Sequence, residues 1–260
     1  MTTSITLMAS MVALAAAVRS TWSPCGLSML STITPISERA KGHSYRSTAL
    51  WFVAGAVAGG VTLGAVIALL AGAVHSLHLP TTVLGSAAFG AALLAAASDA
   101  GIGGVRVPIH RRQVNERWLD QYRAWVYGSG FGWQIGTGLS TYITTAAVYL
   151  MVVLGALTAA PVTALVIGAG FGVVRGLAVL MTRNLTVPAD LRAFHRRFAD
   201  VGPVVGRAVV AAEGLAALVL AVSVGVPADL AVAAGAAGAV ALTVVVTARE
   251  GAAGPLPPAA

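Results

Sequence analysis

The sequence has few charged residues, few aromatic residues and almost no cysteine. Only 10% of its 260 residues are charged and 6% are aromatic, whereas soluble domains are roughly a quarter charged. This shortage of charge argues against a water-soluble enzyme. The single cysteine excludes an internal disulfide and a cysteine-rich metal cluster. The net charge of +7 has no soluble basic domain to carry it, so we expect no nucleic-acid partner.

Apolar residues make up 57% of the chain, and the mean hydropathy is +0.85. A helix needs roughly 20 apolar residues to cross the hydrocarbon core of a membrane. The segments that qualify lie at about 4–35, 48–74, 81–99, 125–157, 161–181, 204–224 and 228–247. The gaps between them are too short to hold a soluble domain. The sequence therefore predicts an all-α polytopic membrane protein with about seven transmembrane helices, one domain over residues 1–250 and a disordered tail over 251–260.

Arginine and lysine alternate between the predicted loops. They occur in the first, third and fifth gaps and at Arg249, and they are missing from the gaps at 75–80, 159–160 and 225–227. Because basic loops stay in the cytoplasm, this predicts an extracytoplasmic N-terminus and a cytoplasmic C-terminus in a bacterial-type plasma membrane. The first segment lacks a basic start, so we expect a retained helix rather than a cleaved signal peptide. The lipid bilayer is then the partner that accounts for the basic surplus.

Two of the predicted spans are interrupted at matching places. Residues 23–26 (Ser-Pro-Cys-Gly) break the first, and the glycine-rich stretch 128–138 is expected to loosen the fourth. The chain is thus predicted to consist of repeat one at about 1–99, repeat two at about 125–224 and an extra helix at 228–247. Three helices per unit give an inverted 3+3 repeat, and paired broken helices in such repeats indicate a functional site in the middle of the membrane. Glycines four residues apart in several spans also predict closely packed helices.

The first break has a specific local interpretation. Ser23 can cap a new half-helix, Pro24 suits its first position, and Cys25 falls in its first turn. A sulfur there lies at the positive end of the helix dipole, which favours a reactive thiolate. The alternative is that Cys25 is a small buried apolar side chain.

Two short motifs carry a family resemblance. Residues 22–25 (Trp-Ser-Pro-Cys) and 131–133 (Phe-Gly-Trp) resemble the two motifs of the CcdA/DsbD transmembrane electron carriers, which share a fold group with LysE-type exporters. The resemblance implies an inverted 3+3 fold that carries reducing equivalents from cytoplasmic thioredoxin to extracytoplasmic thiols, for cytochrome c maturation or disulfide reduction. It also implies one reactive cysteine in each repeat.

This chain departs from that pattern at the second motif. Gly136 stands where the resemblance implies the second cysteine. With a single cysteine thiol, the chain is not a self-sufficient dithiol oxidoreductase. Whether it is an enzyme at all stays open. Thiol exchange then needs a partner, such as a thioredoxin-like or cysteine-containing extracytoplasmic protein, that supplies the second thiol.

Four ionisable residues lie within or at the ends of apolar spans, namely Arg19, Asp99, Arg175 and Glu213. Such residues usually pair or line a cavity, because a lone charge in a membrane is costly. Glu213 is expected either to form an ion pair with Arg175 or Arg19, or to belong to a solute or proton pathway.

Three functions remain open at this point. The favoured one is a redox accessory protein that acts through Cys25, with Ser23 and Pro24 shaping its turn. The second is a small-solute or ion transporter on the same scaffold, and the third is a non-catalytic assembly subunit. The candidate pathway residues are Trp22, Arg19, Trp133, Gln134, Gly136, Thr137, Arg175 and Glu213. No cofactor and no metal site are predicted, since His75 and His78 lack a third ligand nearby.

Overall fold

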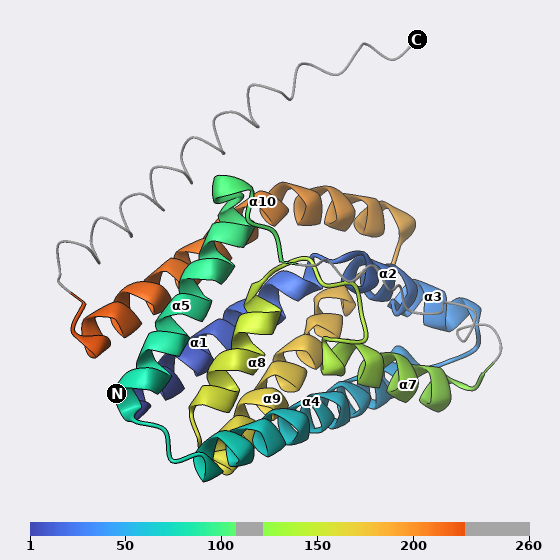
Figure 1. Cartoon of the computed structure of the whole chain (residues 1–260). Helices are drawn as coiled ribbons and strands as arrows, with labels where there is room; N and C mark the ends of the chain where they lie inside the picture. The colour runs from blue at the N-terminus through green and yellow to red at the C-terminus, as the bar shows by residue number, and fades with distance from the viewer. Residues whose placement is uncertain (108–121, 227–260) are drawn as a thin grey trace, which may run out of the picture.

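The computed structural model describes residues 1–107 and 122–226, and these residues form a bundle of helices (Figure 1). Five of the described helical segments are long and apolar enough to cross a membrane. They are Thr2–Thr21, Tyr45–Ser76, Thr81–Ala100, Pro161–Thr182 and Pro188–Val224. Many of their leucine and valine side chains are exposed on the outside of the bundle. The chain is thus a multi-pass helical membrane protein.

The first predicted span is broken where the sequence predicts. Helix α1 (Thr2–Thr21) ends just before Ser23, and α2 (Pro24–Thr32) begins directly after it. A short helix α3 (Pro35–Ala40) follows, and the chain then enters the long α4 (Tyr45–Ser76).

The fourth predicted span is also broken, but at a different place from the one expected. The glycine-rich stretch forms most of a regular helix, α7 (Ala124–Thr137), and the break comes after it, before α8 (Ala147–Leu157). The expectation that residues 128–138 loosen the helix was therefore wrong. The glycines of α7 contact the backbone of α4, so they bring two helices together. The helix ends at Gly138, whose φ of 64° leaves the helical region.

Helix α4 packs against both α7 and α9 (Pro161–Leu177), while α1 packs against α8 and α9. Figure 1 shows α1, α8, α9 and α4 side by side. The approach of α4 and α9 is close, because a Cβ atom at Gly60 would lie 2.6 Å from the carbonyl oxygen of Gly168. The predicted close packing through small residues is confirmed.

Helices α5 (Thr81–Ala100) and α10 (Pro188–Val224) pack on each other and on α1. The sequence predicts a span that begins at about residue 204, but α10 begins at Pro188 and is continuous through Pro203. Two single-turn elements, η1 (Ile102–Gly104) and η2 (Ala178–Thr182), follow α5 and α9.

The predicted extra helix at 228–247 and the tail at 251–260 lie outside the described residues. The inverted relation of the two repeats and the orientation in the membrane stay predictions.

Candidate functional site

Each residue of the turn at 23–26 has a distinct structural role. The Ser23 hydroxyl accepts a hydrogen bond from the backbone N–H of Gly26 at 3.2 Å, and Pro24 occupies the first turn of α2. Gly26 has no side chain, which lets α2 lie against the end of α1, since a Cβ there would collide with the carbonyl oxygen of Thr21. Cys25 is held in the first turn of α2 and is fully buried.

A buried arginine lies near this cysteine. Arg175, near the end of α9, is 2% exposed, and its charge acts on the Cys25 thiol. Its guanidinium lies over the ring of Phe171, 5.8 Å from the ring centre, and its Nη2 atom has no hydrogen-bond partner. Two sources of positive potential therefore act on the Cys25 position, the N-terminus of α2 and a buried guanidinium.

The Cys25 turn and α7 meet in one buried cluster. Cys25 shares this cluster with Phe131 and Ile135 of α7 and with Phe52 of α4. Phe52 and Phe131 pack edge to face with ring centres 5.9 Å apart. Residues of α2 and α7 therefore contribute to the same buried cluster.

Gly136 shows why the second position holds no cysteine. A Cβ atom on Gly136 would collide with the carbonyl oxygen of Ala56 in α4. This position is used for contact between two helix backbones, and in this packing it has no room for a thiol.

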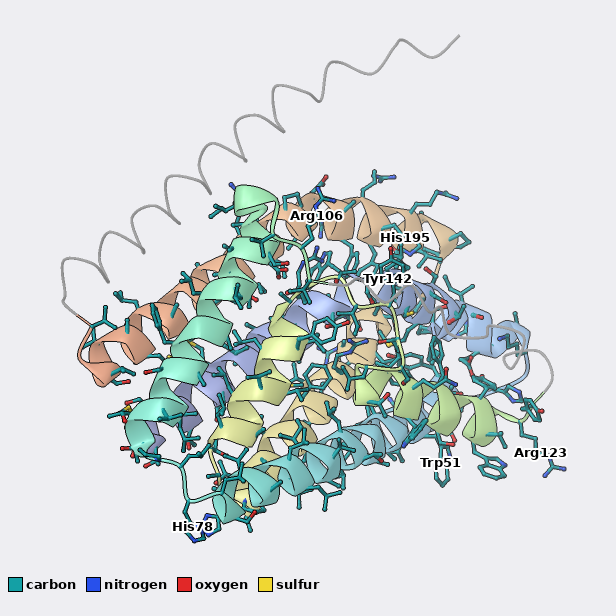
Figure 2. All side chains as sticks on the ribbon, in the orientation of Figure 1. Trp51, His78, Arg106, Arg123, Tyr142 and His195 are labelled. Atoms are coloured by element: carbon teal, nitrogen blue, oxygen red, sulfur yellow. The ribbon has the colours of Figure 1, made fainter. Side chains whose placement is uncertain are left out.

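The first half of α10, residues 188–202, which we call the α10 arm, lies over the α2 side of the site. The Trp22 indole donates a hydrogen bond to the carbonyl oxygen of Phe198 at 2.7 Å, and the two rings stack with centres 4.5 Å apart. Nε2 of His195 lies 3.1 Å from the Ser31 hydroxyl of α2. Figure 2 labels His195 at this side of the molecule. The arm therefore contacts residues on either side of Cys25 in the sequence, and Phe198 belongs to the same buried cluster as Cys25.

The other predicted pathway residues do not gather around Cys25. Trp133 is 43% exposed and donates a hydrogen bond to the Thr62 hydroxyl on the outside of α4 at 3.2 Å. The hydroxyl of Thr137 donates to the carbonyl oxygen of Gln134 at 2.8 Å and closes the end of α7. The guanidinium of Arg19 contacts the Trp22 carbonyl oxygen at 3.5 Å, next to the break.

The expected ion pair of Glu213 is not seen in the part of the chain that the structure describes. Glu213 is fully buried in α10, and neither of its carboxylate oxygens has a hydrogen-bond partner. Arg175 acts on Cys25 instead. Arg19 acts on Asp99, which accepts hydrogen bonds from the Thr145 hydroxyl and, at 2.8 Å, from the Ala146 backbone N–H. Asp99 thus caps the start of α8.

One buried acid was missed by the sequence reasoning. Glu38 in α3 is fully buried and accepts hydrogen bonds from the Tyr127 hydroxyl at 2.6 and 2.7 Å and from the Thr48 hydroxyl. These bonds join α3, α4 and α7, and Tyr127 itself belongs to the Cys25 cluster. The only signal in the sequence was an acidic residue in an otherwise basic gap.

Comparison with known proteins finds several relatives that share one description. The chain is 27% identical over 228 residues to the "Methylamine utilization protein MauF" of Paracoccus versutus, covering 84% of this chain and 80% of that protein. The protein of the same description from Methylobacillus flagellatus is 29% identical, over 77% of this chain and 72% of the relative. That of Paracoccus denitrificans is 28% identical, over 80% and 76%.

No protein-family model matches the chain, and no solved structure matches it. The CcdA/DsbD resemblance therefore stays an expectation from the two motifs. The matches extend over most of both chains and agree in their description, so the chain is a distant homologue of the methylamine utilization protein MauF.

Proposed function

We propose that this chain is a membrane accessory protein of methylamine utilization that exchanges thiols through Cys25 with a partner protein. The observation that carries the proposal is the placement of Cys25 in the first turn of α2, with the buried Arg175 acting on it. A cysteine in the first turn of a helix, next to a cationic side chain, is an arrangement that proteins use for thiol exchange. The MauF relatives supply the methylamine context, and the CcdA/DsbD resemblance supplies the chemistry.

The exchange needs a second thiol from a partner. The Cys25 thiolate attacks a disulfide of one protein, forms a mixed disulfide and releases one thiolate of that protein. A thiol of a second protein then attacks the Cys25 sulfur of the mixed disulfide and releases the remaining thiolate of the first protein, whose disulfide is now fully reduced. The second thiol of the attacking protein resolves the new mixed disulfide, which closes a disulfide within that protein and returns Cys25 to its thiolate form. One dithiol is oxidised and one disulfide is reduced, so the electrons balance without a cofactor.

Because Cys25 is fully buried, a partner reaches it only when part of the covering structure moves. The α10 arm is the element we expect to move. It contacts the site through the Trp22–Phe198 stack and the Ser31–His195 contact, and Pro203 interrupts the hydrogen bonding of α10 directly behind it.

Trapping of the mixed disulfide tests this function. The full chain is expressed in a methylamine-using bacterium that lacks its own MauF, cells are quenched with an alkylating agent, and adducts are separated without reductant. We expect an adduct that reductant removes and that Cys25→Ser lacks, together with loss of methylamine growth in Cys25→Ser. The control is Ser10→Ala, which changes an exposed residue of α1. Growth of Cys25→Ser at the wild-type rate would show that the thiol is not needed and would favour the transport or assembly alternative.

A further inference from the structure

Glu213 is a buried polar residue that the proposed thiol exchange at Cys25 does not use. Its side chain is fully buried in α10, and neither carboxylate oxygen has a hydrogen-bond donor. Glu38, the other fully buried acid of the described residues, differs because Tyr127 and Thr48 both donate to it. An ionised carboxylate without a donor is very costly in an apolar interior.

Helices α5 and α1 pack against α10, and each of them carries one charged side chain. Helix α5 contributes Asp99 and α1 contributes Arg19, which are the only charged side chains of those two helices. Asp99 acts electrostatically on Glu213, and Arg19 acts on Asp99. On α10 itself, the nearest charged residue along the chain is Arg207.

The two acids have unequal surroundings. Burial disfavours the charged form of both acids, but Asp99 also receives hydrogen bonds from the Thr145 hydroxyl and the Ala146 N–H and has Arg19 nearby, which oppose this effect at Asp99 alone. Glu213 has no donor and faces the like charge of Asp99. When one proton is available to the two acids, these surroundings place it on Glu213.

We propose that Glu213 is a proton-binding site inside the helix bundle, with Asp99 as the charged neighbour that controls release of the proton. When the Glu213 carboxylic acid loses its proton, the proton passes to solvent and a carboxylate remains. No atom is oxidised or reduced in this step. The described residues contain no group of three metal-binding side chains, so no metal site is proposed at Glu213. This inference does not depend on the thiol exchange at Cys25.

Infrared spectroscopy of the full chain in lipid vesicles tests the site. At neutral pH we expect the carbonyl band of a protonated carboxylic acid, and we expect D₂O to shift it because the proton exchanges. The band should disappear in Glu213→Gln, which keeps the size of the side chain, and remain in the matched variant Glu38→Gln. A band that persists in Glu213→Gln, or that D₂O does not shift, would overturn the proposal.

A second variant tests the control by Asp99. Ionised Asp99 opposes ionisation of Glu213, so Asp99→Asn should make the Glu213 band disappear at a lower pH than in the wild type. Circular dichroism confirms that the variant keeps its helices. If the folded variant loses the band at the same pH as the wild type, Asp99 does not control the proton and the proposed pairing is wrong.

Discussion

At the scale of single residues, the Cys25 turn follows from rules that act over a few neighbouring positions. A serine cap and a proline in the first helical turn are local preferences, and both are present at Ser23 and Pro24. The sequence therefore predicted the geometry of this turn in detail. The partner of Cys25 was not predictable in the same way, because Arg175 is 150 positions away along the chain (175 minus 25) and only the packing of α9 brings it near.

The electrostatic role of Arg175 gives a prediction. Arg175 acts electrostatically on Cys25, so Arg175→Gln should slow alkylation of Cys25 at neutral pH several-fold. The rate is measured by mass spectrometry with a small maleimide. Arg183→Gln is the control, because Arg183 is exposed beyond the end of η2, and its rate should match the wild type. Equal alkylation rates for the two variants would show that Arg175 does not influence the reactivity of Cys25.

At the scale of helices, the glycines of α7 show where sequence reasoning is ambiguous. Glycine lowers helix stability, and it also lets two helices approach closely. The sequence around Gly132 and Gly136 is compatible with both effects, and we expected the first. The structure has the second, because the facing backbone of α4 fills the space that side chains would occupy. Only the partner helix decides between these outcomes, and its position is a property of the whole fold.

The packing of α7 on α4 predicts the effect of restoring a second cysteine. Gly136→Cys should destabilise the protein by about 1–3 kcal/mol or more, because the new side chain collides with the α4 backbone. It should form no disulfide with Cys25. Thermal unfolding in detergent and non-reducing mass spectrometry measure the two effects. Gly90→Cys is the matched control, since nothing lies within 4 Å of a Cβ at Gly90. A disulfide between Cys25 and the thiol introduced at 136 would show that the two positions face each other.

The α10 arm predicts how access to Cys25 is controlled. Phe198→Ala removes the ring that stacks on Trp22, so the arm should open more often and alkylation of Cys25 should become several-fold faster. Val201→Ala, on the exposed side of the same arm, should leave the rate unchanged. If Phe198→Ala also leaves it unchanged, another element controls access and the arm is only a fixed part of the bundle.

At the scale of the whole molecule, hydropathy predicted about seven spans, of which the described residues contain five. It placed Tyr45–Ser76, Thr81–Ala100 and Pro161–Thr182 to within a few residues, because burial in lipid depends on length and composition. It did not distinguish one long helix from two short ones, as α7 and α8 show. It also did not join the α10 arm to the span that follows it. These features depend on contacts between helices, which hydropathy does not describe.

The orientation of the bundle is predicted from its basic loops, and it can be measured at two exposed positions. His78 lies in the loop after α4, a gap without arginine or lysine, and Arg123 lies just before α7 in a basic gap. Figure 2 labels the two residues at well-separated ends of the molecule. In a Cys25→Ser background, His78→Cys should react with a membrane-impermeant maleimide in intact cells, whereas Arg123→Cys should react only after the membrane is opened. The reverse pattern would place the N-terminus in the cytoplasm, and the partner that exchanges with Cys25 would then have to be sought on the opposite side.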